Sequence, residues 1–312
     1  MIEVAGLTKQ YKSVRAVDDL TFQVEPGQVT GFLGPNGAGK STTMRMILGL
    51  DKPTAGTALV HGKPYRELKN PLREVGALLD AKAVHANRTA ANHLTWMAQA
   101  NGIPTSRVDE VLGLVGLADV AGKKAGGFSL GMGQRLGLAA ALLGDPGVLI
   151  LDEPVNGLDP EGIRWVRSLV RALAAEGRTV LISSHLLAEM AQTADHLVVI
   201  GRGRLLANQR TYDFVKENSS ASVIVRSEHL REFGSALKEA GITYSESVDE
   251  EQRPTLVIPH QTTDYVGQLA YSTGVPLTEL TLHRASLEEA YVAMTDRAVQ
   301  YQAAAPQEGV QR

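Results

Sequence analysis

The chain has 312 residues, of which 44% are hydrophobic, and its formal net charge at pH 7 is -3. This length and composition can bury a full core and predict more than one domain. The small negative charge gives no bulk attraction to nucleic acid or to an anionic membrane, so we expect no nucleic-acid partner. The absence of cysteine excludes disulfides, thiolate metal ligands and cysteine nucleophiles.

No segment reaches the length of a membrane span, and the longest apolar stretches, such as residues 136–143, are far too short. The first residues lack a charged leader followed by an apolar core, so we expect no signal peptide. The sequence taken alone predicts a cytosolic protein, and any role at a membrane would need a partner.

The N-terminal part of the chain carries strand patterns that lead into a glycine-rich segment. Residues 2–7 and 20–24 alternate apolar and polar side chains well enough for strands. An apolar stretch at residues 29–33 is followed by the sequence GPNGAGKS at residues 34–41. A helical pattern then continues until Gly49 ends it.

This glycine-rich segment matches the pattern G-x-x-x-x-G-K-S between a strand and a helix, which is the setting of a phosphate-binding loop. Glycines let backbone N–H groups crowd around a polyphosphate, and the helix start adds its positive dipole end. Lys40 would bridge the β- and γ-phosphates, and the Ser41 hydroxyl would ligate Mg²⁺. The candidate nucleotide-binding residues here are Gly34, Asn36, Gly37, Gly39, Lys40, Ser41 and Thr42.

The middle of the chain, residues 86–144, is rich in Ala, Leu, Gln and Asn and has no strand pattern, so we expect a helical insertion. Apolar strands at residues 148–151, 179–182 and 196–200 then alternate with helices, one of which opens at Pro160. This alternation predicts an α/β fold with a parallel sheet covered by helices.

The pattern changes from residue 221 onward to the order β-α-β-β-α-β, that of a small α+β, ferredoxin-like domain. Residues 286–289 form a capping-box sequence for one more helix. We therefore expect a nucleotide-binding domain at residues 1–215, an accessory domain at 221–296 and a disordered tail at 297–312.

Two adjacent acids, Asp152 and Glu153, end the apolar strand at residues 148–151. A carboxylate at such a strand end can hold the shell of a Mg²⁺ ion, and a second one beside it can polarise an attacking water. Buried strand ends rarely carry two adjacent acids without a cation to balance them, so a purely structural role is the weaker interpretation.

Two further segments point to phosphate. His185 follows the strand at residues 179–182, on the edge expected to carry the phosphate loop, which favours a γ-phosphate contact. Ser129 and Gly131 begin an apolar helix whose small residues and N-terminus form a second potential phosphate site. A chain with two phosphate-facing surfaces predicts a dimer closed around nucleotide.

The chain resembles the nucleotide-binding subunit of ATP-binding-cassette transporters. The resemblance lies in five segments that occur in the same order: the phosphate loop, the segment at Ser129, the strand ending in Asp-Glu, the loop Asn-Gly-Leu-Asp at residues 156–159 and the later histidine. The resemblance covers about residues 1–215. It implies a P-loop cassette with antiparallel N-terminal strands, ATP and Mg²⁺ as cofactors, and a homodimer. It also implies a separate transmembrane permease subunit as partner, at the cytoplasmic face of the membrane.

The resemblance assigns roles to single residues. Lys40, Ser41 and Asp152 would serve the phosphates and Mg²⁺. Glu153 would be the general base, and His185 would sense the γ-phosphate.

Other residues would complete the nucleotide site. By the same resemblance, Tyr11 would stack on adenine, and Ser129 and Gly131 would cap the γ-phosphate of the ATP bound to the opposing subunit. Asp159, in the Asn-Gly-Leu-Asp loop, is a further candidate nucleotide contact.

The sequence departs from the family pattern at two places. Asp80 stands where the family has a glutamine that touches Mg²⁺ and the membrane partner, and its carboxylate could still ligate Mg²⁺. Leu130 and Met132 replace a glycine and a polar residue of the usual signature. These departures and the C-terminal extension resemble ATPases of bacterial drug export, of the daunorubicin- and bacitracin-resistance type. We therefore expect an ATP hydrolase that powers export of a drug, antibiotic or lipid-like substrate.

Two alternatives remain open on the sequence. A soluble cassette ATPase that acts on nucleic acid or ribosomes usually carries long coiled coils, two cassettes or basic arms, none of which occurs here. A nucleotide-gated regulatory module would bind ATP with little turnover. Glu153 and His185 argue against that module, while Asp80 and Leu130 are compatible with it.

Overall fold

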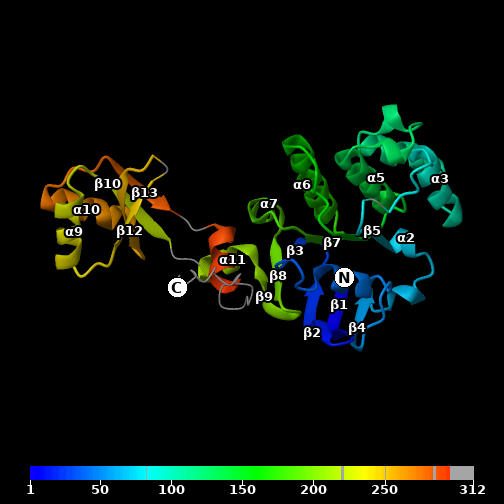
Figure 1. Ribbon diagram of the computed structural model, residues 1–312, viewed down its shortest axis with the longest axis horizontal. Coiled ribbons are helices and arrows are strands. Elements are labelled where there is room, and N and C mark those ends of the chain that lie inside the picture. The colour runs from blue at the N-terminus through cyan, green and yellow to red at the C-terminus, as the bar shows by residue number, and fades with distance from the viewer. Residues whose placement is uncertain (82, 219–220, 250, 284–285, 296–312) are drawn as a thin grey trace, which may run out of the picture. The chain divides into compact units, whose positions relative to one another are not determined.

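The computed structural model describes residues 1–81, 83–218, 221–249, 251–283 and 286–295. The tail predicted at 297–312 lies outside the described residues. The described chain divides into two compact units, Met1–Thr211 and the residues from Tyr212 onward (Figure 1). Nowhere in the described residues does a helix combine the length and apolarity that crossing a membrane requires.

The first unit is built on a six-stranded sheet, with its strands in the order β5 (Val75–Leu78), β6 (Val148–Leu151), β7 (Thr179–Ser183), β3 (Val29–Leu33), β8 (His196–Gly201) and β9 (Arg204–Arg210). The first five strands pair in parallel, whereas β9 is antiparallel to β8. Every residue of β3, β6 and β7 is buried, as expected for parallel strands covered on both faces. The expected α/β class and parallel sheet are confirmed.

A second, antiparallel sheet has the order β2 (Val14–Val24), β1 (Ile2–Tyr11) and β4 (Ala55–Val60). It lies on one side of the six-stranded sheet (Figure 1). Side chains from both sheets and from helix α1 (Lys40–Ile47) form one continuous core, which includes Ile2, Phe22, Met44 and Val198. The phosphate loop therefore leads into a helix that is anchored by both sheets.

Helices α6 (Pro160–Ala175) and α7 (Leu187–Thr193) lie on the opposite side of the six-stranded sheet (Figure 1). The segment predicted as a helical insertion contains α3 (Ala90–Ala100), α4 (Ser106–Leu114) and α5 (Leu130–Leu142). Helix α5 packs along β5, at the edge of the sheet. Shorter turns complete the unit: η1 (Tyr65–Glu67), α2 (Pro71–Glu74), η2 (Ala118–Val120) and η3 (Ala125–Gly127).

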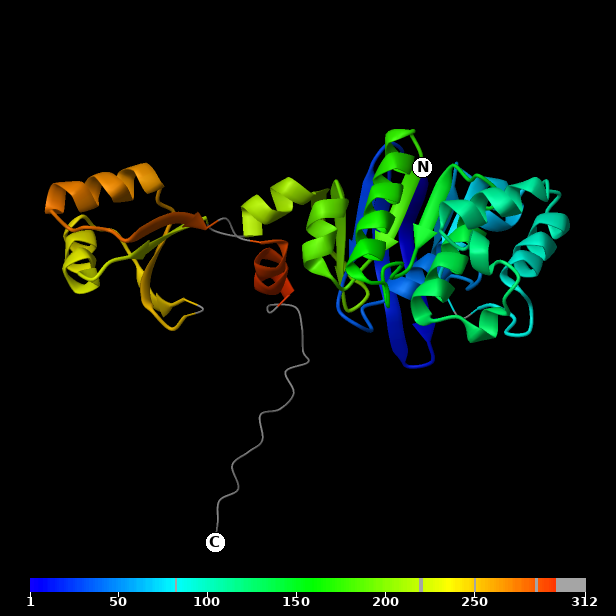
Figure 2. The ribbon, with the colours of Figure 1, turned by 90° about the horizontal axis from the view of Figure 1, so that it is seen from above.

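The second unit contains an antiparallel sheet in the order β11 (Ser245–Val248), β12 (Pro254–Pro259), β10 (Ser222–Arg226) and β13 (Glu279–His283). Helices α9 (Leu230–Glu239) and α10 (Thr263–Thr273) follow β10 and β12 along the chain (Figure 2). Val223, Ile258, Phe233 and Val266 join the sheet and both helices in one core. The assignment of this unit to the ferredoxin-like folds stays a prediction.

Two further helices flank these elements in the chain, α8 (Thr211–Asn218) and α11 (Leu287–Thr295). At the start of α11, the Glu289 backbone N–H donates to Ser286 Oγ at 3.1 Å, and the Ser286 backbone N–H donates to Glu289 Oε2 at 3.1 Å. This reciprocal pair is the capping box predicted from the sequence.

Ion pairs tie the strands of the second unit together. Arg226 on β10 contacts Asp249 at 2.7 Å and also pairs with Glu279 on β13. The backbone N–H of Arg253 donates to Asp249 at 2.9 Å, and the Arg253 guanidinium contacts the same carboxylate at 2.8 Å. Hydrogen bonds from Arg253, from its backbone first, and from the Glu251 backbone lower the pKa of Asp249 to about 2.

This pKa predicts how the second unit responds to acid. Because the folded unit holds Asp249 ionised, the carboxylate stabilises it fully above the ordinary pKa of 3.8, and this stabilisation is lost as the pH falls toward about 2. We expect wild type to unfold at a higher temperature than Asp249→Asn near neutral pH, with the gap closing over that range. Scanning calorimetry of both chains at stepwise pH would measure it, and a constant gap would contradict the assignment.

Candidate nucleotide-binding site

The phosphate loop joins the end of β3 to the start of α1. Gly39, which precedes the first helical residue, has φ 106°, a left-handed conformation that side chains rarely adopt. A Cβ atom there would also lie 2.4 Å from the carbonyl oxygen of Ala16. Glycine is therefore required at this position on two grounds, and the loop holds its backbone close to β2.

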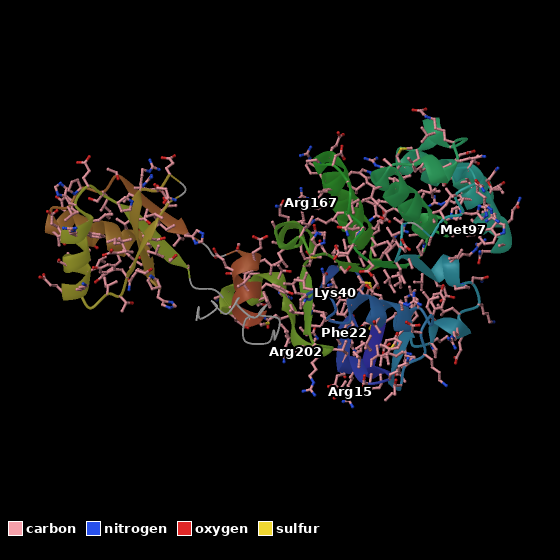
Figure 3. The ribbon with its side chains drawn as sticks, in the orientation of Figure 1. Arg15, Phe22, Lys40, Met97, Arg167 and Arg202 are labelled. Carbon is pink, nitrogen blue, oxygen red and sulfur yellow. The ribbon has the colours of Figure 1, made fainter. Side chains whose placement is uncertain are left out.

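Lys40 is buried although it carries a charge, and only 8% of it is exposed. Its Nζ donates to the carbonyl oxygens of Gly34 at 2.6 Å and Pro35 at 3.3 Å (Lys40 is labelled in Figure 3). Burial lowers the pKa of the Lys40 ammonium, and the charges of Glu153 and Asp152 oppose that shift. The ammonium is thus held inside the loop by neutral carbonyl groups, where a phosphate would provide the full counter-charge.

Asp152 stands at the end of β6, between two hydroxyl groups. Its Oδ2 accepts from Ser41 Oγ at 2.6 Å, and its Oδ1 accepts from Ser183 Oγ at 2.5 Å. The Asp152 backbone N–H donates to the carbonyl oxygen of Leu78, in the neighbouring strand β5. The strands β6 and β7 and helix α1 are thereby joined at one carboxylate.

The oxygens of Ser41 and Asp152 have the chemistry that Mg²⁺ requires, because this ion takes hard oxygen ligands in a nearly ideal octahedron. No cluster of three or more His, Asp or Glu side chains that could enclose a metal occurs in the part of the chain that the structure describes. The two side chains therefore fit an ion that keeps phosphate and water in the rest of its shell, and they do not form a closed protein cage.

Glu153 and His185 meet beside this carboxylate. Glu153 Oε2 lies 2.7 Å from His185 Nδ1 and accepts from the His185 backbone N–H at 3.2 Å. The Glu153 backbone N–H donates to Ser183 Oγ at 2.9 Å, so that one serine contacts both acids. Glu153 has φ 51°, which places a residue with a side chain in the left-handed region.

A cavity of about 290 Å³ unites most of the predicted residues. Ala16 from β2 and Leu79 after β5 line it without having been predicted; both reach it through tertiary packing, which no local pattern announces. The lining residues are Ala16, Asn36, Gly37, Gly39, Lys40, Ser41, Thr42, Leu79, Asp152 and Glu153. This space is open to solvent and is bounded by backbone amides, one ammonium, hydroxyls and two carboxylates, a set of groups suited to a polyphosphate with a divalent ion.

Other predicted residues lie outside that lining. Tyr11 is exposed at the end of β1, and its hydroxyl donates to Asp51 Oδ2 at 3.1 Å. Asp80 follows β5 at the same sheet edge as Asp152. Asp159 caps α6 by accepting from the Gly162 backbone N–H at 2.9 Å. The nucleotide and metal roles expected of Tyr11, Asp80 and Asp159 stay predictions.

Ser129 and Gly131 also lie away from the cavity, at the start of α5. Ser129 is the N-cap residue, and its Oγ accepts from the Met132 backbone N–H at 3.3 Å. Gly131 lies next to the loop after Glu153, because a Cβ atom on it would be 3.1 Å from the Gly157 carbonyl oxygen. Within one chain, these two residues do not meet the phosphate loop.

Sequence reasoning missed two residues that contact the acids. Ser183, the last residue of β7, bridges Asp152 and Glu153, and only its place at a strand end could have suggested this. Gln134 donates from Nε2 to the Glu153 carbonyl oxygen at 2.8 Å, a contact between distant segments that no sequence pattern signals.

Comparison with known proteins places the chain in a family. The family model described as "ABC transporter" matches residues 17–156, and a model of a domain of unknown function matches residues 221–288. The chain is 37% identical to the bacitracin transport ATP-binding protein BcrA of Bacillus licheniformis, over 94% of this chain and 97% of the relative. The chain therefore belongs to the ABC transporter family, as one of its ATP-hydrolysing subunits.

Two further comparisons agree with this assignment. The daunorubicin/doxorubicin resistance ATP-binding protein DrrA of Streptomyces peucetius is 32% identical, over 94% of this chain and 92% of the relative. A solved structure of the ATP-binding subunit of an ABC transporter matches with a TM-score of 0.64 at 28% identity, and covers 70% of this chain and 92% of that one. The drug-resistance resemblance seen in the sequence is confirmed.

The buried ammonium makes Lys40 the residue whose removal should most affect nucleotide binding. A hydrogen bond to a charged group contributes about 1.5–3 kcal/mol, so we expect Lys40→Ala to weaken ATP binding roughly ten- to a hundredfold. Equilibrium binding of a fluorescent ATP analogue would measure this. Lys63→Ala, which changes an exposed lysine after β4, is the control and should bind as wild type does. Normal binding by Lys40→Ala would contradict the phosphate-loop assignment.

Proposed function

We propose that this protein powers export of a peptide antibiotic or drug through a separate transmembrane permease, by hydrolysing Mg²⁺-bound ATP at the cavity between Lys40 and Glu153. The observation that carries this proposal is the placement of Lys40, Ser41, Asp152 and Glu153 around one cavity. One ammonium for phosphate, one hydroxyl-carboxylate pair for a divalent ion and one further carboxylate for water are the groups that phosphoryl transfer to water needs.

Each residue has a defined task in this proposal. The amides of the phosphate loop and the Lys40 ammonium would hold the phosphates. Ser41 and Asp152 would hold Mg²⁺, which would supply positive charge against the charge that develops on the phosphates. Glu153 orients and deprotonates the attacking water. His185, whose Nδ1 lies 2.7 Å from the Glu153 carboxylate, holds that carboxylate at the cavity and contacts the γ-phosphate.

The proposal includes a homodimer. Ser129 and Gly131 start a helix of thirteen residues but do not line the cavity of their own chain. Backbone N–H groups at a helix start are suited to bind an anion, so these residues would serve the ATP bound to a second subunit. ATP then stabilises the closed dimer through its higher affinity for that state, and hydrolysis releases it.

The proposed substrate class and location follow from the relatives. BcrA is named for bacitracin transport and DrrA for daunorubicin and doxorubicin resistance, and both match the second unit as well as the first because the matches cover 94% of this chain. We propose the cytoplasmic face of the membrane as the location, with the permease holding the subunit there.

The carboxylate of Glu153 gives the most direct test of the hydrolysis step. Glu153→Gln keeps the size of the side chain and removes the base, so turnover should fall by roughly 10² or more while ATP binding is retained. Phosphate release and equilibrium ATP binding would measure the two properties separately. Unchanged hydrolysis by this variant would remove Glu153 from the catalytic step.

The proposed partner can be tested by purification from solubilised membranes, with and without ATP. We expect an integral membrane protein to be recovered with the tagged chain, and the amount to change with nucleotide because the dimer changes state. Lys40→Ala, tested in parallel, should lose the nucleotide dependence. Recovery of ribosomes in place of a membrane protein would contradict the exporter proposal.

A further inference from the structure

The backbone of Glu153 needs support from its surroundings. With φ 51°, this residue lies in the left-handed region, which residues with a Cβ atom occupy at a cost in free energy. Such a conformation persists only where neighbouring groups hold it. The orientation of the Glu153 carboxylate depends on this conformation, because the side chain leaves the backbone at that Cα atom.

Two side chains bond the backbone of Glu153, in addition to the Asn156 backbone N–H, which donates to the Glu153 carbonyl oxygen at 3.2 Å. Ser183 Oγ accepts from its N–H at 2.9 Å, and Gln134 Nε2 donates to its C=O at 2.8 Å. Ser183 belongs to β7, the strand beside β6. Gln134 belongs to α5, in the helical insertion, and only 5% of it is exposed. The Gln134 contact is therefore a link from the insertion to the residue proposed as the base.

The oxygen of the Gln134 amide makes no contact comparable to the hydrogen bond of its nitrogen. Its Oε1 is buried without a hydrogen-bond partner among the described residues. A buried acceptor left unpaired costs free energy, and replacing such a group by an apolar one of the same shape can be neutral or stabilising. The stabilising contact of this amide is therefore the one from Nε2 to the Glu153 carbonyl oxygen.

A second contact from the same helix holds the loop that follows Glu153. Leu130 lies one turn before Gln134 on α5, so the two side chains lie on the same face of this helix. The Leu130 side chain occupies the space beside Gly157, where a Cβ atom would lie 2.2 Å from Leu130 Cδ2. Gly157 also has φ 73°. Helix α5 thus contacts the segment 153–157 at both ends, at Glu153 through Gln134 and at Gly157 through Leu130.

We propose that Gln134 is a positioning residue for Glu153. By bonding the Glu153 carbonyl oxygen, its amide holds the backbone of Glu153 in the left-handed conformation. This conformation keeps the Glu153 carboxylate at the cavity and within reach of His185. This inference rests on the proposed role of Glu153 as the base. Gln134 does not line the phosphate cavity, so it acts on the rate of hydrolysis and leaves the affinity for ATP unchanged.

The test is Gln134→Met, which keeps the length and volume of the side chain and removes the donor. A small displacement of a catalytic group lowers rates strongly, so we expect kcat to fall roughly ten- to a hundredfold. KM for ATP and equilibrium ATP binding should match wild type. The melting temperature should stay close to that of wild type. The lost bond to the Glu153 carbonyl oxygen, which also accepts from the Asn156 backbone N–H at 3.2 Å, is offset by removal of the buried unpaired acceptor.

Asn101→Leu is the matched control. Asn101 lies in the same insertion, at the end of α3, and its Nδ2 donates to the Met97 carbonyl oxygen at 2.9 Å. This variant also loses one bond from a side-chain amide to a backbone carbonyl, but the carbonyl belongs to Met97 in α3 and not to Glu153. We expect wild-type kcat for Asn101→Leu. An equal loss of turnover in both variants would mean a general effect on the insertion and would overturn the inference.

A double variant separates this inference from the proposed function. In the Glu153→Gln background, Gln134→Met should cause little further loss of turnover, because both changes act on one group. An additive loss would overturn the inference, as would wild-type kcat in Gln134→Met beside an inactive Glu153→Gln. Normal turnover by Glu153→Gln alone would remove the role of Glu153 itself, and the inference with it.

Discussion

The candidate site of the first unit depends on one carboxylate, which accepts hydrogen bonds from two hydroxyl groups. Asp152 bonds Ser41 from the start of α1 and Ser183 from the end of β7. Parallel strands end at the same edge of a sheet, so polar groups from segments far apart in sequence meet there. The Asp152 bonds join the end of β6 to α1 and β7, and Ser183 in turn accepts from the Glu153 backbone N–H.

The charges of that site favour binding of an anionic ligand together with a divalent cation. A buried ammonium is unfavourable unless an opposite charge is paired with it. The Lys40 ammonium donates to two neutral groups, the carbonyl oxygens of Gly34 and Pro35. The carboxylates of Asp152 and Glu153 act on it from a greater distance. A polyphosphate with its divalent ion would place negative charge beside the lysine and positive charge beside the acids. Binding energy can thus arise from interactions that the free protein leaves incomplete.

Local sequence patterns predicted the parts of the site that one segment supplies. The glycine-rich loop and the apolar strand before Asp152 each have a short-range cause, which is glycine freedom or burial on both faces. The same holds outside the site for the capping box at Ser286, which is a reciprocal hydrogen bond. The contacts of Ser183, Leu79 and Gln134 arise only when distant segments are packed together, so no local pattern could reveal them. The antiparallel edge strand β9 escaped prediction for a related reason, since its pairing with β8 is defined by the sheet.

The contact between Leu130 and Gly157 has a consequence for how this sequence can change. The volume beside residue 157 is already filled by the leucine, and its backbone angle disfavours any side chain. A larger residue at 157 is therefore incompatible with leucine at 130, although the two positions are far apart in the chain. In related proteins with a smaller residue at 130, the space beside residue 157 is free for a side chain. The positive φ angle at residue 157 still disfavours any residue other than glycine there. Variation at these two positions should consequently be correlated among homologues, with substitutions at 157 found chiefly where residue 130 is small.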